Sequence, residues 1–208
     1  MKNKKPVRRR ARDKQETREI ISESYDDPYD NPNPMRRTIK VNQLPWTDKQ
    51  KEFFKIALNH ETKIMFVNGP AGTAKSLLSV YCGLQLLNMK AISDIMYLRS
   101  AVESSESKLG MNWRSKCVIL DEAQNSSMKE ITTVLTRLGQ GSRCFVLADP
   151  MQTDLRSRDQ IGGFEKLYKK FGDDDSKDMG IHTFEFNTDD IMRSKLCKFI
   201  VKKVNTIT

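Results

Sequence analysis

The sequence lacks any apolar run that approaches the roughly 20 residues of a membrane span. Its N-terminus is basic and has no apolar core of the kind found in secretory signal peptides. We therefore expect neither a membrane protein nor a secreted one, and predict a cytoplasmic location. At 208 residues the chain is long enough for one sizeable core and short for two.

Cysteine is also scarce, and its spacing excludes the usual cysteine-based sites. The four residues, Cys82, Cys117, Cys144 and Cys197, lie singly in apolar stretches and form no CxxC pair. Zinc sites and disulfide frameworks normally need closely or regularly spaced cysteines. The sequence therefore predicts buried, reduced thiols.

Positive charge is abundant, with a net charge of +9, and much of it lies near the N-terminus. Residues 1–19 hold nine lysines and arginines and three acidic residues. Such an arm often binds nucleic acid through phosphate contacts, although a solvated, disordered tail fits equally well. A linker rich in Pro and Asp follows at 22–34. We predict a disordered arm and linker over 1–37 and a single domain over 38–208.

A glycine-rich stretch lies between the apolar run 64–67 and the helix-like stretch 77–88. Strand, glycine-rich turn and helix in this order predict a phosphate-binding loop, because the N–H groups and dipole of a helix N-terminus attract phosphate. A turn without a ligand is the alternative. In the loop, Lys75 would reach the β- and γ-phosphates and Ser76 would ligate Mg²⁺. The predicted nucleotide-binding residues are Gly69, Pro70, Ala71, Gly72, Thr73, Ala74, Lys75 and Ser76.

Ala74 stands where such loops usually carry glycine. Alanine avoids positive φ more strongly than glycine does. We therefore expect residue 74 to lie in the ordinary helical region, as the first part of the helix.

Two carboxylates, Asp121 and Glu122, follow the apolar strand predicted at 117–120. In an α/β sheet they would lie at the carboxyl edge, beside the phosphate loop. Asp121 can hold Mg²⁺ through water, and Glu122 can orient or deprotonate the attacking water. Gln152 follows the predicted strand 143–148 to the same edge, where it could contact the γ-phosphate. Solvated acids and an ordinary turn are the alternatives.

Gln50 allows two interpretations. Thr47 and Gln50 have the spacing of a capping box at the start of a helix, whereas the amide of Gln50 could also recognise adenine by donating and accepting hydrogen bonds. Position alone does not decide between them. The other expected elements are a short strand at 39–41, strands at 63–68, 93–98 and 182–186, a helix at 75–89, helical spacing over 164–171, an acidic loop at 173–178 and a closing helix at 189–204.

The stretches 69–76, 118–125 (VILDEAQN), 147–155 (LADPMQTDL) and 99–103 (RSAVE) occur in the order found in PhoH-family ATPases. Over residues 43–204 the chain resembles this family, in its short phage type. PhoH proteins are similar to the first RecA-like domain of superfamily 1 helicases. The resemblance implies a three-layer P-loop α/β fold with a mostly parallel sheet, Mg-dependent ATP hydrolysis, an RNA or single-stranded DNA partner, and a hexamer.

The resemblance also implies roles for single residues. Gln50 corresponds to the adenine-reading glutamine of the family, Gln152 to the γ-phosphate sensor and Arg193 to an arginine near the C-terminus. The predicted catalytic residues are Lys75, Glu122, Gln152 and Arg193, and the predicted metal ligands are Ser76 and Asp121.

The chain departs from the family in a shorter segment between Gly110 and Trp113. Parallel neighbouring strands need a crossover of a dozen or more residues, usually helical. Only 18 residues separate Leu98 from Cys117, without a clear helical period. Either the crossover is short and irregular, or the chain omits a flexible piece.

The predicted function is ATP hydrolysis coupled to binding or remodelling of RNA or single-stranded DNA. An ATP-binding regulatory or RNA-binding assembly module with negligible turnover is the alternative, and a small-molecule kinase is disfavoured because no arginine-rich lid is evident. The chain has length for one RecA-like domain. The arginine that a second domain would supply must then be Arg193 itself or come from a neighbouring subunit. Arg156 and Arg158 are other candidates, and Arg193 could equally be an ordinary surface arginine.

Overall fold

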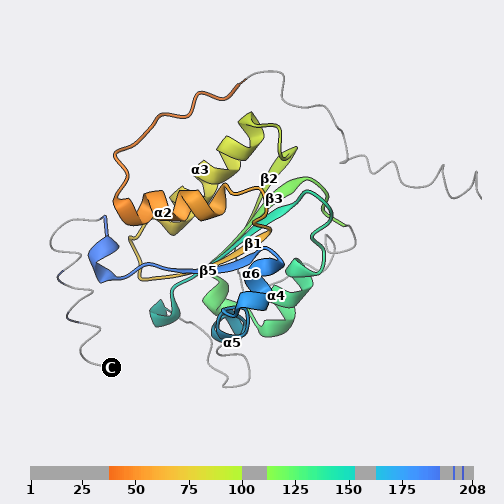
Figure 1. Cartoon of the computed structure of the whole chain (residues 1–208). Helices are drawn as coiled ribbons and strands as arrows, with labels where there is room; N and C mark the ends of the chain where they lie inside the picture. The colour runs from red at the N-terminus through yellow and green to blue at the C-terminus, as the bar shows by residue number, and fades with distance from the viewer. Residues whose placement is uncertain (1–37, 100–111, 153–162, 193–198, 200–202, 204–208) are drawn as a thin grey trace, which may run out of the picture. The chain divides into compact units, whose positions relative to one another are not determined.

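Five strands form one sheet in the order β2-β3-β4-β1-β5, and every pair of neighbours is parallel (Figure 1). The structure is a computed structural model, and it describes residues 38–99, 112–152, 163–192, 199 and 203. The elements in chain order are α2 (Asp48–Ala57), β1 (Ile64–Asn68), α3 (Lys75–Asn88), β2 (Asp94–Arg99), β3 (Lys116–Asp121), α4 (Met128–Leu135), β4 (Arg143–Ala148), α5 (Gly163–Lys170), α6 (Asp174–Asp178) and β5 (Ile181–Glu185).

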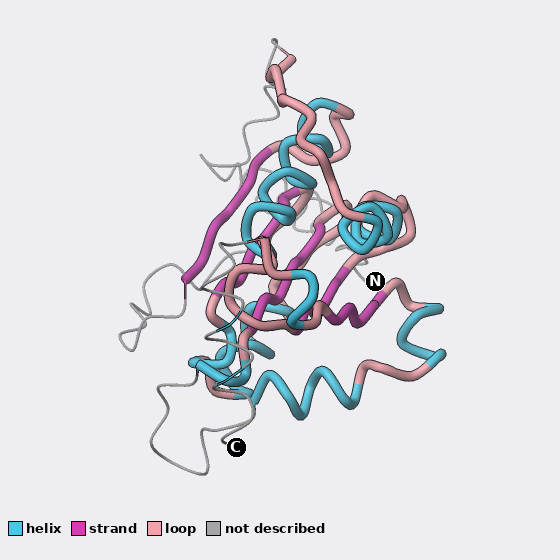
Figure 2. Tube along the Cα trace, turned by 90° about the vertical axis from the view of Figure 1, so that its left-hand side faces the viewer, coloured by secondary structure: helices cyan, strands magenta, loops and turns pink. Residues whose placement is uncertain are grey.

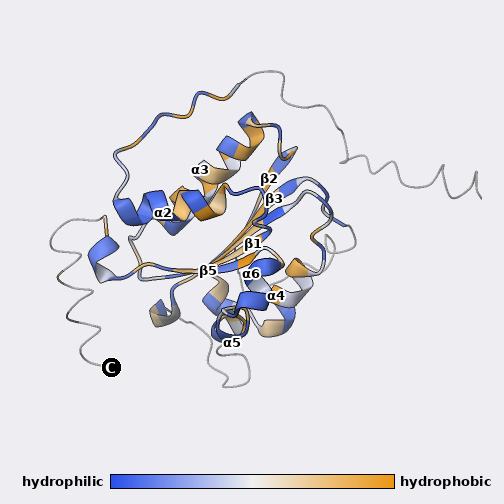
Figure 3. Ribbon diagram, viewed as in Figure 1, coloured by the Kyte–Doolittle hydropathy of each residue, from blue (hydrophilic) through white to orange (hydrophobic). Residues whose placement is uncertain are grey.

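The sheet is covered by helices on both faces. Successive side chains of a strand point to opposite faces: Met65 and Val67 of β1 pack with α2 and α3, whereas Phe66 packs with α4 and α5. Strands buried in this way are apolar almost throughout, as Figure 3 shows for the centre of the molecule. The predicted three-layer α/β fold with a mostly parallel sheet is confirmed.

Parallel pairing brings the carboxyl ends of the strands to one edge. Asn68 at the end of β1 is level with Ala148 at the end of β4, and Asp121 at the end of β3 is level with Arg99 of β2. Figure 2 shows the strands running side by side toward this edge. The segments that follow β1, β3 and β4 therefore meet there, as α/β sheets require of a ligand site.

Capping boxes begin two of the helices, α2 and α4. The N–H of Gln50 donates to Thr47 Oγ1 over 3.2 Å, and the N–H of Thr47 donates to Gln50 Oε1 over 3.1 Å. Ser127 and Glu130 make the same reciprocal pair at α4. These bonds satisfy helix N–H groups that have no partner within the helix.

Two expected elements were wrong. Residues 39–41 form no strand, because the backbone N–H and C=O of Ile39 pair with the side-chain amide of Asn88, each over 2.9 Å. The expected acidic loop at 173–178 is the short helix α6. Asp173 caps it by accepting the N–H of Ser176 over 3.0 Å. Carboxylates in a first turn favour a helix through its dipole, so the acidic run promotes helix formation at this point.

The closing helix does not begin at residue 189. Thr188–Asp190 form a 3-10 turn, and Ile191 is extended and fully buried. Tertiary contact explains this, since the N–H of Met192 donates to the carbonyl of Gly72 over 2.9 Å. Phe199 and Lys203 are helical. The arm, the crossover at 100–111, Cys197 and the arginines at 156, 158 and 193 lie outside the described residues.

The thiol prediction is confirmed for Cys82, Cys117 and Cys144, which are buried and free. Burial raises the pKa of Cys117 to about 12 and raises the pKa of the other two as well. Within the part of the chain that the structure describes, no helix has the length and apolar character needed to cross a membrane.

Candidate functional site

The phosphate loop, residues 69–76, connects β1 to α3 and depends on backbone conformations that are rare outside glycine. Gly72 has φ +89°, which a side chain makes unfavourable. Gly69 lies directly on Phe186, where an added Cβ would come within 2.8 Å of the phenylalanine Cβ. The loop therefore places its own main chain against the segment that follows β5.

Ala74 adopts a left-handed conformation, with φ +66° and ψ +23°. The expectation that it lies in the ordinary helical region was wrong. Helix α3 begins at Lys75, and residue 74 is the cap, whose carbonyl accepts the N–H of Leu78 over 2.9 Å. A left-handed residue other than glycine costs roughly 1–2 kcal/mol. The loop tolerates this strain because the chain must turn before the helix begins.

Lys75 lies almost wholly buried beneath the loop. Its ammonium donates to the carbonyl of Gly69 over 2.6 Å and to that of Pro70 over 3.1 Å. Burial lowers the pKa of Lys75, and the carboxylates of Asp149, Asp121 and Glu122 oppose that shift. The positive charge of the Lys75 ammonium is thus held where the loop would bind phosphate.

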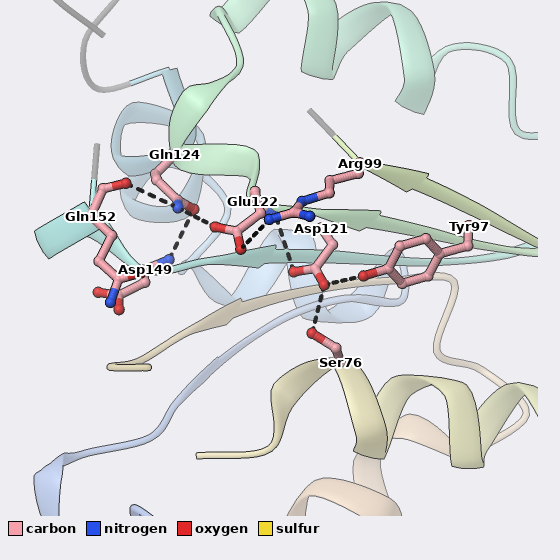
Figure 4. Close-up of polar contacts among 8 residues, drawn as sticks. All are labelled: Ser76, Tyr97, Arg99, Asp121, Glu122, Gln124, Asp149 and Gln152. Carbon is pink, nitrogen blue, oxygen red and sulfur yellow. Dashed lines mark hydrogen bonds and ion pairs between the residues drawn. The ribbon is translucent and has the colours of Figure 1, made fainter. Parts of the chain in front are cut away.

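Ser76, Tyr97 and Asp121 form a cluster that we call the cation corner (Figure 4). Asp121 Oδ2 accepts hydrogen bonds from the hydroxyl of Ser76, over 2.6 Å, and from the hydroxyl of Tyr97. Asp121 Oδ1 accepts the N–H of Glu122 over 2.9 Å. A hydroxyl and a carboxylate are the hard oxygen ligands that Mg²⁺ prefers, normally with phosphate oxygens and water. The donor set therefore fits the predicted cation.

Gln124 joins the ends of β3 and β4. Its Nε2 donates to Glu122 Oε2 over 2.6 Å and to the carbonyl of Gln152 over 3.2 Å, while its Oε1 accepts the N–H of Asp149 over 3.0 Å. Figure 4 shows this set of contacts, which we call the amide bridge. The side chain of Gln124 is buried. The amide bridge therefore holds Glu122 and the turn at Gln152 in one arrangement.

Glu122 itself adopts a left-handed conformation, with φ +57°. Strained residues of this kind cluster at functional sites because the surrounding contacts hold them in place. Here the amide bridge holds one carboxylate oxygen, and the Arg99 guanidinium lies 3.7 Å from the other. Burial raises the pKa of Asp149, against the effect of the nearby Lys75 ammonium.

Most of these groups, Tyr97 and Arg99 excepted, line a cavity of about 380 Å³, within the range of small-molecule sites. It contains five of the predicted side chains, Lys75, Ser76, Asp121, Glu122 and Gln152, together with Ala71, Gly72 and Ala74 of the loop. The other lining residues are Leu77, Gln124, Ala148, Asp149 and Met192. The sequence therefore predicted five of the side chains that meet here.

Gln50 does not line this cavity. It is buried in the capping box of α2, where Thr47 uses its amide oxygen. The helix-initiation interpretation is thus observed, and contact with adenine stays a prediction.

Asp149, Gln124 and Tyr97 are polar residues of the site that were not assigned from the sequence. Asp149 directly follows β4 as Asp121 ends β3, so the same strand-end rule would have found it. Gln124 lies two positions beyond the carboxylates and depends on a cross-strand contact. Tyr97 is on the edge strand, where strand alternation offers no signal of a hydroxyl contact with Asp121.

Comparisons with known proteins show the family of the chain. The chain matches the model of the family described as PhoH-like protein over residues 43–115 and 110–205. It is 28% identical to a PhoH-like protein of Mycobacterium bovis, over 76% of this chain and 56% of the relative. It is 35% identical to Protein PhoH of Escherichia coli K12, over 43% of this chain and 24% of that protein.

A PhoH-like protein of Synechocystis is 28% identical, over 56% of this chain and 49% of its own length, so the chain spans about half the length of the curated relatives it matches. Among solved structures, unliganded Pif1 from Bacteroides sp. is similar, with a TM-score of 0.43, 15% identity, and coverage of 76% of this chain and 45% of that chain. The two stretches of the family match overlap at residues 110–115, which include the segment between Gly110 and Trp113 that is shorter than in the family.

Proposed function

Since the chain belongs to the PhoH-like protein family, we propose that it is a magnesium-dependent ATPase. The observation that carries the proposal is the cavity that unites the phosphate loop with the ends of β3 and β4. Its lining supplies groups for three tasks: Lys75 for phosphate, Ser76 and Asp121 for the cation, and Glu122 for the attacking water.

Nucleotide binding would begin at the loop. Its N–H groups and the N-terminus of α3 attract the phosphates, and the Lys75 ammonium would exchange the carbonyls of Gly69 and Pro70 for phosphate oxygens. Ser76 and Asp121 would hold Mg²⁺, which supplies positive charge to the β- and γ-phosphates when bound.

Hydrolysis would then depend on Glu122. The amide bridge and Arg99 restrain its carboxylate at the cavity, where it can orient a water and take its proton. Gln152 lines the same cavity and would contact the γ-phosphate. Because Gln124 contacts both residues, the base and this phosphate contact would respond to each other.

The proposal is tested by two variants with opposite signatures. Lys75→Ala should abolish tight ATP binding, because the loop loses its cation. Glu122→Gln should keep ATP binding and lose turnover by about a hundredfold or more, since only the base changes. Equilibrium binding of a fluorescent ATP analogue and phosphate release measure the two effects. Parental turnover in Glu122→Gln would contradict the assigned role.

A regulatory or assembly module that binds ATP without turnover is separated by the same assay. Phosphate release is measured with and without a panel of RNA and DNA oligomers. Stimulation by one class of oligomer would support a nucleic-acid-linked ATPase. Binding without turnover under every condition would favour the module.

We further propose that the partner is RNA or single-stranded DNA and that residues 1–19 contribute to its binding. Their nine lysines and arginines suit phosphate contacts. Deleting the arm should weaken binding and reduce the slope of affinity against salt by roughly one unit for each phosphate that the arm neutralises. An unchanged slope would make the arm a passive tail.

We also propose that a head-to-tail ring, favoured as a hexamer, completes the site with Arg193 of a neighbouring subunit. Mixing Arg193→Ala subunits with Glu122→Gln subunits should restore activity, because some interfaces then join an intact Glu122 site to an intact Arg193. Particle mass with ATP is measured in parallel. A monomer with full turnover would contradict the ring.

A further inference from the structure

Tyr97 contacts the site although it lies on an edge strand, where its side chain could face solvent alone. It lies on the edge strand β2 and is 49% exposed, yet its hydroxyl donates to the nearly buried carboxylate of Asp121. Burial and the contact with Asp121 raise the pKa of Tyr97 to about 12. The phenol has one hydrogen to donate, and Asp121 accepts it.

Hydrogen bonds occupy most of the acceptor positions of the Asp121 carboxylate. An ionised carboxylate offers about four lone-pair positions, two on each oxygen. Ser76 and Tyr97 occupy the two positions of Oδ2, and the N–H of Glu122 occupies one of Oδ1. Within the described part of the chain, one acceptor position on Oδ1 is left.

Tyr97 also restricts how the carboxylate can rotate. Ser76 approaches Asp121 from the phosphate loop, and the Glu122 N–H approaches it from the turn that follows β3. Tyr97 approaches from the neighbouring strand β2 (Figure 4). Three donors from three segments fix the plane of the carboxylate. Loss of the Tyr97 hydroxyl would reopen a second acceptor position and allow the plane to turn.

We propose that Tyr97 is a positioning residue for Mg²⁺, which holds Asp121 so that a single oxygen lone pair faces the cation or its water. The inference rests on the proposed nucleotide site and adds a residue to it. Hydrogen-bond partners of metal-binding carboxylates typically contribute ten- to a hundredfold to metal affinity. Since Ser76 and the Glu122 N–H remain, we expect the lower end of that range.

The test measures binding of a fluorescent ADP analogue to the full-length protein as Mg²⁺ is titrated, and again in EDTA. Tyr97→Phe should raise the Mg²⁺ concentration at half-maximal binding about tenfold and leave the affinity in EDTA unchanged. Tyr81→Phe is the matched control, because Tyr81 packs against Trp46 and Phe54 away from the cavity. It should change neither quantity.

The outcomes separate this inference from the proposed function. If the parent protein binds the analogue with a Mg²⁺ dependence that Tyr97→Phe leaves unmoved, the role of Tyr97 is wrong and the nucleotide site stands. An equal fall of affinity with and without Mg²⁺ would also overturn it, because Tyr97 would then support the loop and not the cation. If the parent protein does not bind the analogue at all, the proposed function itself fails.

Discussion

The two walls of the cavity are built by different means. The phosphate-loop wall is mostly main chain, shaped by positive φ at Gly72 and Ala74, with Lys75 and Ser76 as its polar side chains. The opposite wall, at the ends of β3 and β4, is made of side chains that hold one another through Gln124. The loop wall therefore depends on local backbone shape, whereas the opposite wall depends on contacts between strands.

The largest effect is expected from a methyl group in the loop wall. Gly69→Ala would place a Cβ 2.8 Å from Phe186 Cβ and 3.0 Å from its carbonyl oxygen. The main chain at residue 69 and at residue 186 must then move apart. We therefore expect a loss of about 1–3 kcal/mol in the free energy of unfolding and loss of tight nucleotide binding. Chemical denaturation and equilibrium binding measure these.

Gly172→Ala is the matched control for that variant. A Cβ at residue 172 would meet its nearest atom, the Lys169 carbonyl oxygen, at 3.5 Å, an ordinary contact. Stability and nucleotide binding should both stay close to those of the parent. If Gly69→Ala behaves like the control, the loop wall is not determined by backbone shape.

A different effect is expected from the opposite wall, similar in stability but smaller in nucleotide affinity. Gln124→Leu removes the amide bridge and leaves the buried N–H of Asp149 without its acceptor. Such a loss costs about 1–3 kcal/mol in stability. Turnover should fall more than nucleotide affinity, because Glu122 loses its restraint while the loop is untouched. Phosphate release and analogue binding distinguish the two.

Gln140→Leu, on an exposed turn, controls for the change of glutamine to leucine. It should leave turnover and affinity unchanged. Equal losses of turnover and affinity in Gln124→Leu would mean that the two walls do not act separately.

The smallest effect is a gain. Ala74→Gly removes left-handed strain of roughly 1–2 kcal/mol. It also makes the unfolded chain more flexible, which lowers the free energy of unfolding by about 0.4–1 kcal/mol. The free energy of unfolding should rise by about 0.5–1 kcal/mol. Lys90→Gly, at φ +57° outside the cavity, should give a similar gain without any change in nucleotide affinity. Destabilisation by Ala74→Gly would show that the loop is not strained.

Much of the fold followed from the sequence because its signals are local. Apolar strands, two capping boxes and a glycine-rich turn each act within a few residues, and parallel pairing then brings the predicted Lys75, Ser76, Asp121, Glu122 and Gln152 to one edge. Tertiary contacts decided two of the misplaced elements. Ile39 pairs with Asn88, and residues 191–192 lie against the phosphate loop instead of starting a helix.

The sequence by itself therefore determined which residue types lie at the ends of β1, β3 and β4. The residues of each segment are enough to specify a strand and the chemistry of the loop that follows it. Tertiary structure alone decided how those ends interact. Gln124 reaches from β3 to Asp149, and Tyr97 reaches from the edge strand to Asp121. The left-handed turn at Ala74 belongs with them, because the start of α3 and the packing of the loop, and not the preference of alanine, set its backbone. Contacts between residues distant in the chain have no local pattern, so they become visible only when the sheet is assembled.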